Sequence, residues 1–138
     1  MTSFVLDNSV TMRWCFDSGS HAYADAVLQR LETRQSDAIA PILWRYETSA
    51  VLARAQRNGV LTEQRVKDFF DDLAALPITV DTNTTEAVFA EIHRLAVTCR
   101  LTSYDAAYLE LAMRKKLPLA TLDDELRKAC ISAGVSIF

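Results

Sequence analysis

The chain has 138 residues, 50% of them hydrophobic and 24% charged, with a formal net charge of −3 and a sequence pI near 5.3. This length and composition predict one soluble globular domain over residues 1–138, and the absence of an apolar run near about 18 residues excludes a membrane span. The charge neither requires nor forbids a nucleic-acid partner, although a tight sequence-independent binder would normally be basic overall.

Short apolar runs alternate along the chain with stretches whose apolar residues recur at helical spacing. The runs predict strands and the stretches predict helices. In the first half, the expected elements are a strand at Ser3–Leu6, helices at about 9–16 and 21–34, a strand at Ala38–Ala40 closed by Pro41, and a helix at about 43–57. Ser18-Gly19-Ser20 is expected to form a turn that can cap the second helix, and Asn58-Gly59 is a helix stop signal.

The second half continues the same alternation. Its expected elements are a helix from Thr62 to about Leu76, a strand at Ile78–Val80, a helix that starts at Thr84 or Thr85, a helix from Thr102 or Ser103 to Lys115-Lys116, a strand at Pro118–Ala120, a helix at about 124–133, and a terminal strand at Val135–Phe138. Two inward stripes are clear: Val66, Phe69, Phe70 and Leu73 in one helix, and Val88, Ile92, Leu95, Ala96 and Cys99 in another.

The expected strands are short, wholly apolar and separated by helices. This pattern predicts an α/β fold with a mostly parallel sheet that is covered by helices on both faces. In such sheets, functional sites form beyond the carboxyl ends of the strands. Asp7 and Asp123 follow two of the expected strands, so both are predicted to lie at this edge.

Four acidic residues fall where an unpaired carboxylate is costly, at a strand end or on a predicted inward stripe. They are Asp7, Glu47, Asp105 and Asp123. Carboxylates that are brought close together raise one another's pKa and destabilise a fold unless a cation neutralises them. Hard oxygen ligands suit Mg²⁺ or Mn²⁺, and such ions can activate water for attack on a phosphate ester. The sequence therefore predicts a shared divalent-metal site for hydrolytic chemistry.

Each acid also has a purely structural interpretation. Asp7 can cap the following helix, although this leaves Ser9 unexplained, and Asp123 can cap the last helix. Asp124 fits a first-turn acid that the helix dipole favours.

The two acids within helices have structural alternatives as well. Glu47 falls in the predicted arc of Leu43, Ala50 and Val51, and it could form a buried pair with Arg54. Asp105 completes a capping box that begins at Thr102, yet it also heads the stripe that continues with Leu109, Ala112 and Met113.

The remaining polar and aromatic residues give weaker indications. Cys15, Cys99 and Cys130 are widely separated and fit small core residues in a reducing compartment, and no signal peptide is evident, so we expect a cytoplasmic protein. His21 and His93 are expected to be exposed. Trp14, Trp44 and Tyr46 are expected in the core or at an interface, and Arg13, Arg45, Arg54 and Arg57 are candidates for phosphate contact.

The chain resembles the PIN-domain proteins, in particular the VapC-like toxin ribonucleases, in four places that span almost its entire length. These are Val5-Leu6-Asp7-Asn8-Ser9-Val10, Glu47 in the third helix, Tyr104-Asp105-Ala106-Ala107-Tyr108-Leu109-Glu110-Leu111-Ala112, and Leu119-Ala120-Thr121-Leu122-Asp123. The last two segments are the more specific. The resemblance implies a three-layer α/β/α sandwich with Mg²⁺- or Mn²⁺-dependent endoribonuclease activity.

The resemblance also implies roles for individual residues and partners. Asp7 and Asp105 would be the principal metal ligands, Glu47 and Asp123 would complete the acidic cluster, and Ser9 and Thr121 would support it by hydrogen bonds. A homodimer is implied, together with a small antitoxin that binds near helices 43–57 and 62–76. Phe69, Phe70 and Trp44 could line that groove.

Three other functions compete with an RNA-cleaving toxin. One is an aspartate-based phosphotransferase or phosphatase with Asp7 as the nucleophile, although such sites generally want a second acid where Ser9 stands. Another is a response-regulator-like binding module, which would want paired acids in the first loop. The third is a PIN-like module that binds RNA or protein without cutting.

Overall fold

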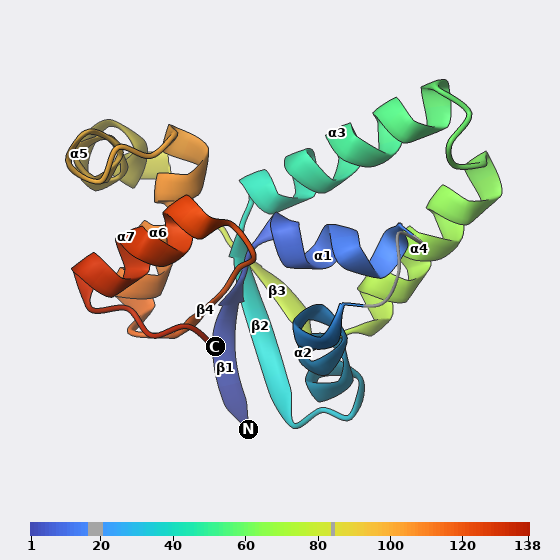
Figure 1. The fold of residues 1–138 in the computed structure, drawn as a ribbon, viewed down its shortest axis with the longest axis horizontal. Helices are drawn as coiled ribbons and strands as arrows, with labels where there is room; N and C mark the ends of the chain where they lie inside the picture. Colours follow the sequence, from blue (N-terminus) through green and yellow to red (C-terminus); the bar gives the residue numbers. More distant parts are fainter. Residues whose placement is uncertain (17–20, 84) are drawn as a thin grey trace.

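The computed structural model describes residues 1–16, 21–83 and 85–138, so the expected turn at Ser18-Gly19-Ser20 and a helix start at Thr84 lie outside the described residues. The described part contains one four-stranded sheet with the order β3-β2-β1-β4, in which every pair is parallel (Figure 1). The strands are β1 (Thr2–Leu6), β2 (Ser36–Pro41), β3 (Ile78–Asp81) and β4 (Leu119–Ala120). The predicted parallel sheet is therefore confirmed.

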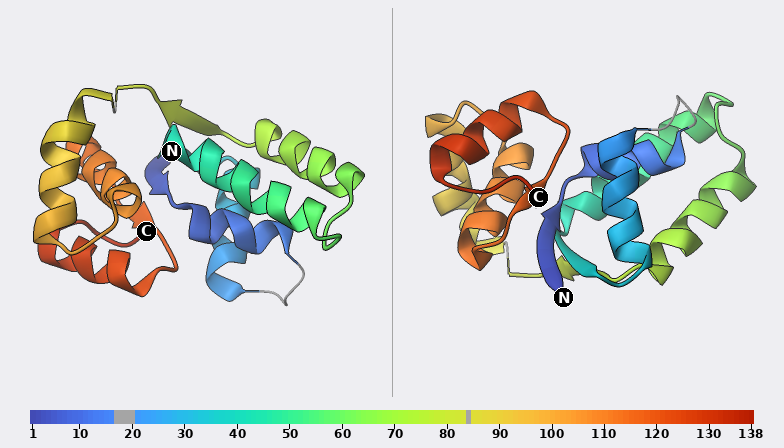
Figure 2. Two further views of the ribbon diagram at one scale, coloured as in Figure 1. Left: turned by 90° about the horizontal axis from the view of Figure 1, so that it is seen from above. Right: turned by 60° about the horizontal axis from the view of Figure 1, so that its bottom comes forward.

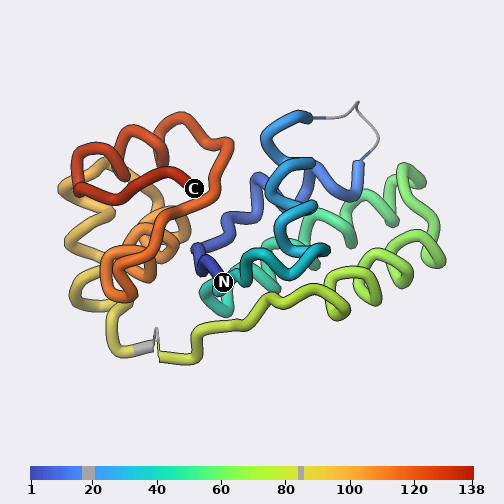
Figure 3. Tube along the Cα trace, turned by 90° about the horizontal axis from the view of Figure 1, so that it is seen from below, coloured from blue at the N-terminus to red at the C-terminus, as the bar shows by residue number. Residues whose placement is uncertain are grey.

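Helices cover both faces of the sheet, which confirms the predicted three-layer α/β architecture (Figures 1 and 2). The first layer holds α1 (Asn8–Cys15), α2 (Ala22–Glu32), α3 (Leu43–Arg57) and α4 (Glu63–Ala75), and the second holds α5 (His93–Thr98), α6 (Ser103–Lys115) and α7 (Asp124–Ala133). Figure 3 follows the chain from β3 into the second layer. No helix in the described ranges has the length and apolarity that a bilayer crossing requires.

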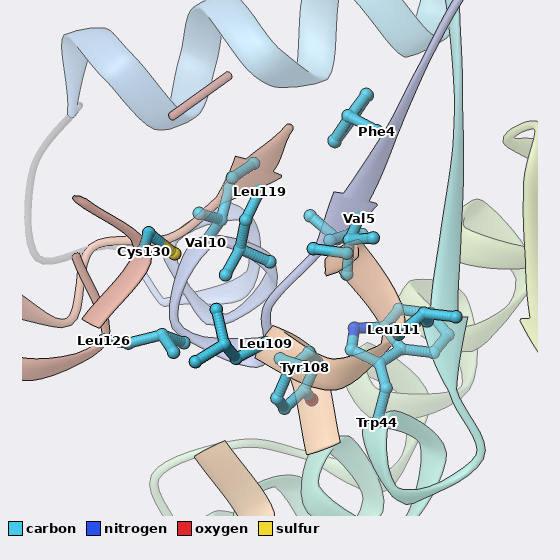
Figure 4. Close-up of a cluster of buried hydrophobic side chains, with 14 of the residues drawn as sticks. Phe4, Val5, Val10, Trp44, Tyr108, Leu109, Leu111, Leu119, Leu126 and Cys130 are labelled. Atoms are coloured by element: carbon cyan, nitrogen blue, oxygen red, sulfur yellow. The ribbon is translucent and has the colours of Figure 1, made fainter. Parts of the chain in front are cut away.

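The core lies on both sides of β1, one of the two central strands of the sheet, whose last three residues are apolar. Phe4, Val5 and Leu6 are completely buried, as continuous apolar runs in covered parallel sheets must be. Helix α6 packs over β1 and β2 and buries every residue from Ala106 to Ala112. Figure 4 shows side chains from β1, α1, α3, α6, β4 and α7 meeting in this core.

A smaller apolar cluster joins α1, α3 and α4. Its buried members are Cys15, Leu52, Val66 and Phe69. Thr62 caps α4 as expected, because its hydroxyl accepts a hydrogen bond from the Arg65 N–H at 3.1 Å. The predicted α4 stripe is wrong at Phe70, which is 42% exposed.

The three cysteines behave as predicted. None of them forms a disulfide within the described part of the chain, Cys15 and Cys130 are buried, and Cys99 is half-buried. Burial in apolar surroundings raises the pKa of the Cys130 thiol to about 11, so it packs as a neutral side chain.

Two sequence predictions need correction. The helix expected from Thr85 to Cys99 is divided into a 3₁₀ turn at Thr85–Ala87, a π-helical turn at Val88–Ile92, and α5. An apolar spacing of four residues fits a π turn as well as an α turn, so the pattern does not separate them. The terminal strand expected at Val135–Phe138 is reduced to one parallel bridge between Leu119 and Ile137, because β4 offers only two residues.

Candidate functional site

The strand order places a topological switch point between β1 and β4. The chain leaves β1 into α1 in the first helical layer and leaves β4 toward α7 in the second (Figure 1). A crevice outside the carboxyl ends of adjacent strands forms where successive connections diverge in this way. Asp7 directly follows β1 and Thr121 directly follows β4, so the fold brings the two ends of the chain to one location.

Asp7 is the buried centre of this location, with 4% of its surface exposed. The Ser9 hydroxyl donates to Asp7 Oδ2 at 2.5 Å, and the Thr121 hydroxyl donates to the same oxygen at 2.7 Å. Burial raises the pKa of Asp7, and these hydroxyls oppose the rise. The structure thus brings Ser9 and Thr121 to Asp7, as the sequence predicted. Asp7 does not cap α1 with its side chain.

The two hydroxyls are themselves held by the backbone after β4. The Leu122 N–H donates to Ser9 Oγ at 2.9 Å, and the Asp123 N–H donates to Thr121 Oγ1 at 3.1 Å. The first bond ties the start of α1 to the segment after β4, and the second lies within that segment. The Asp7 carboxylate is therefore oriented both by the nearby Ser9 and by Thr121, which is more than one hundred positions away.

Glu47 approaches from α3 and is half-buried. The Tyr108 hydroxyl donates to Glu47 Oε1 at 2.6 Å. Burial raises the pKa of Glu47, the Tyr108 bond lowers it, and the negative charges of Asp7 and Asp105 raise it again. The alternative of a buried pair between Glu47 and Arg54 is wrong. Arg54 is exposed, and the Glu47 carboxylate accepts its hydrogen bond from Tyr108.

The sequence reason given for Glu47 was wrong even though Glu47 does reach the site. The expected inward arc contains Ala50 and Val51, which are both exposed. The buried residues of α3 are Trp44, Thr48, Leu52 and Ala55. Burying Trp44 and Leu52 removes more apolar area from water than burying Ala50 and Val51, and this area sets the inward face.

Asp105 lies in the first turn of α6 and is half-buried. Thr102 caps this helix by accepting from the Asp105 N–H at 3.1 Å, so the capping interpretation holds in part. The pKa of Asp105 is raised to about 6, first by burial and then by the charges of Asp7 and Asp123. The charges of Asp7 and Asp123 both act on Asp105, so the three carboxyl groups lie near one another at this edge of the sheet.

Asp123 combines both predicted roles. It is the N-cap of α7, where its Oδ1 accepts from the Leu126 N–H at 2.8 Å. Its charge is also close enough to Asp105 to raise the pKa of that residue. Asp124 is exposed in the first turn of α7, as predicted.

The charges of this group are not balanced by basic side chains. Burial raises the pKa values of Asp7, Glu47 and Asp105, and neighbouring carboxylates raise those of Glu47 and Asp105 further; among the described residues, no Lys or Arg contributes to lowering any of the three. Across the described ranges, however, no three His, Cys, Asp or Glu side chains converge tightly enough to form a metal cage. The all-carboxylate donor set suits Mg²⁺, which typically binds one or two carboxylates and completes its shell with water and substrate phosphate.

Sequence reasoning missed two contacts of the site. Tyr108 belongs to a motif that resembles the PIN-domain proteins, and the structure shows that its hydroxyl also holds Glu47. Its spacing of three from Asp105 on α6 was the available signal, because residues three apart share a helix face. Asn8 Nδ2 donates to Thr48 Oγ1 at 2.9 Å, which links α1 to α3 beside the site.

Other predicted positions divide between confirmation and correction. His93 is exposed as expected, but His21 is half-buried and caps α2 through Nδ1, which accepts from the Ala24 N–H at 3.4 Å. Trp44 is in the core, where its Nε1–H donates to Thr11 Oγ1 at 2.9 Å. Tyr46 is 71% exposed, so of the two expected positions, core or interface, the core is wrong for Tyr46 and the interface stays a prediction. The four candidate arginines, Arg13, Arg45, Arg54 and Arg57, all lie on the surface of α1 or α3.

Comparison with known proteins gives a family and two structural neighbours. The model of the PIN domain family matches residues 4–131. The chain is similar to the crystal structure of PAE2754 from Pyrobaculum aerophilum, with 23% identity over 93% of this chain and 84% of that one, and a TM-score of 0.62. It is also similar to FitAcB from Neisseria gonorrhoeae, with 19% identity over 98% of this chain and 96% of that one, and a TM-score of 0.65. No curated protein matches the chain.

Proposed function

Because the chain belongs to the PIN domain family, whose members are in general metal-dependent nucleases, we propose that it is an endoribonuclease that requires Mg²⁺ or Mn²⁺. The supporting observation is the set of carboxylates at the switch point: burial raises the pKa values of Asp7, Glu47 and Asp105, and the charges of neighbouring carboxylates raise those of Glu47 and Asp105 further. A pocket that keeps negative charge without a basic partner is stabilised when it binds a divalent cation.

The proposal assigns Asp7 and Asp105 as the metal-holding residues, with Glu47 and Asp123 completing the cluster. When bound, the ion would supply an activated water and charge stabilisation for attack on an RNA phosphodiester. Ser9 and Thr121 orient Asp7 by donating two hydrogen bonds to Oδ2.

Tyr108 orients Glu47 in the same way, because its hydroxyl donates a hydrogen bond to Oε1. Hydrogen bonds of this kind to ligating carboxylates are typical of metal centres. The carboxylates of Asp7 and Glu47 are thus held in a defined orientation before a substrate binds.

We further propose that the protein is the toxin of a type II toxin–antitoxin pair, a cytoplasmic homodimer with residues 1–138 as its nuclease domain. The groove expected for the antitoxin has a counterpart between α3 and α4, a pocket of about 420 Å³. Trp44 and Phe70 line it as expected, whereas Phe69 is 3% exposed and belongs to the smaller apolar cluster. We expect a small open reading frame immediately upstream, whose product binds this chain. If that product bound the Phe70→Ala variant with unchanged affinity, the result would contradict the groove as its binding site.

The substitution Asp7→Asn tests the catalytic proposal. Asn keeps the shape of the side chain but removes the charge, so we expect RNA cleavage in Mg²⁺ to fall by at least about a hundredfold, as for loss of a principal catalytic group. Single-stranded RNA and purified protein suffice for the measurement, with circular dichroism to show that the fold is kept. Asp124→Asn is the matched control, because Asp124 is an exposed acid at the same sheet edge. Cleavage by Asp7→Asn at the wild-type rate would refute the assignment.

A further inference from the structure

A second, mainly apolar recess lies at the other half of the same sheet edge. We call it the strand-end pocket; it has a volume of about 370 Å³ and lies between the ends of β2 and β3, the π-helical turn and the start of α6. Its apolar walls are Ile42, Leu43, Val88, Ile92, Tyr104 and Ala107. Ligand pockets span roughly 300–1,000 Å³, so this recess has room for one small, flat, apolar group.

The strand-end pocket and the acidic site share the start of α6. Tyr104 lines the pocket, and the next residue, Asp105, lies near enough to Asp7 and Asp123 for their charges to act on it. On α3, Leu43 lines the pocket one helical turn before Glu47. A chain that lies across the carboxyl ends of the strands would meet the acids at β1 and β4 and the pocket at β2 and β3.

The charge of the pocket excludes a phosphate and favours a neutral group. Asp81 is its one charged wall residue, and the Arg114 Nη2–H donates to Asp81 Oδ2 at 2.7 Å. Glu110 receives a second bond from the same guanidinium, from Arg114 Nε at 2.8 Å. The guanidinium charge is thus engaged by buried carboxylates, while Ser103 and Thr82 are the polar, uncharged residues of the wall.

Tyr104 itself is an exposed aromatic side chain, with 65% of its surface accessible. An exposed aromatic ring offers a face on which a base can stack, and base–aromatic stacking contributes about 1–3 kcal/mol per base. Resting on the proposed ribonuclease function, we propose that the strand-end pocket receives one unpaired base of a single-stranded RNA substrate, stacked on Tyr104, next to the phosphodiester that is cut.

The test uses a short single-stranded RNA with one cleavage site and a series in which each base in turn is replaced by an abasic nucleotide. With the wild-type protein, loss of one base near the cut is expected to raise KM about tenfold, which corresponds to about 1.4 kcal/mol. Tyr104→Ala is expected to raise KM on the intact RNA by a similar factor, to change kcat less than about twofold, and to lose the sensitivity to that abasic position. Tyr104→Phe keeps the ring and is expected to behave as wild type.

Phe89→Ala is the matched control, because Phe89 is an aromatic residue on the adjacent π-helical turn, 98% exposed and outside the pocket wall. It should leave KM unchanged. The inference is overturned if Tyr104→Ala leaves KM unaltered. It is also overturned if the increase in KM caused by Tyr104→Ala adds fully to the increase caused by an abasic nucleotide at every position. It is also overturned if Tyr104→Ala acts only by changing the oligomeric state in light scattering, which would make the pocket a contact between two copies. Absence of cleavage by the wild type is a different result, because it refutes the ribonuclease proposal itself.

Discussion

At the scale of single residues, the site is defined by where charge is left unbalanced. Asp7 is buried with two hydroxyl partners, and Asp105 is half-buried beside two other carboxylates. In the metal-free protein, these partly buried carboxylates repel one another, and this repulsion lowers the free energy of unfolding. Such a cost is usual where a fold holds a functional group ready for a partner.

The pKa of Asp105 gives a prediction about stability and pH. A folded-state pKa of about 6, above the ordinary 3.8, means that the native state binds more protons than the unfolded state between these values. The metal-free protein should therefore lose stability as pH rises from about 4 to about 6, with the full cost present above that range. Because Asp105 is half-exposed, solvent screens its charge, and we expect the loss in the free energy of unfolding to be about 1 kcal/mol.

Asp105→Asn removes this cost, and thermal melts in EDTA measure it. The melting temperature is expected to rise by about 2–5 °C at pH 8 and to change little at pH 4, since Asp105 is then protonated. Asp124→Asn, an exposed neighbour of the site, serves as the control at both pH values. Equal effects of Asp105→Asn at pH 4 and pH 8 would contradict the charge explanation.

At the scale of elements, α6 links the core to the site. Its buried face packs on β1 and β2, while its first turns carry Asp105 toward Asp7 and Tyr108 toward Glu47. The sequence predicted the existence of this helix and its start, because Thr102 is a recognisable cap. It did not reveal that Tyr108 would hold Glu47, since that contact joins residues 61 positions apart.

Tyr108→Phe tests the link between α6 and α3. It keeps the buried ring but leaves the half-buried Glu47 carboxylate without its donor, which should lower the free energy of unfolding by about 1–2 kcal/mol. Urea denaturation at neutral pH measures the change. Tyr104→Phe on the same helix is the control, because its ring is exposed. An equal, small effect of both substitutions would show that the Tyr108 hydroxyl does not stabilise the arrangement.

At the scale of the whole molecule, the alternation of apolar runs and helical stretches was enough to predict the layered fold and the edge at which the acids meet. Contact-level detail was not predictable from one sequence. The inward face of α3 carries Trp44 and Leu52 instead of the arc that includes Ala50 and Val51, because the best packing depends on the partner surface. Tyr46 is exposed for the same reason.

The switch point between β1 and β4 is also a property of the whole topology. Strand order 3-2-1-4 follows from which helices cross which face, and local patterns do not encode it. Once it is known, Asp7, Thr121 and Asp123 become neighbours by necessity, and α6 and α3 bring the other two acids to them.

Metal-dependent thermal stability is the most direct measurement of whether these carboxylates form one cation site. A divalent ion that binds only the native state stabilises it by RT ln(1 + [L]/Kd), about 2.7 kcal/mol at one hundred times Kd. The melting temperature of the wild type should rise steadily with Mg²⁺ or Mn²⁺ up to millimolar concentrations, and Asp7→Asn should abolish the rise while Asp124→Asn preserves it. A wild-type melting temperature that does not change at millimolar Mg²⁺ and Mn²⁺ would contradict the shared site.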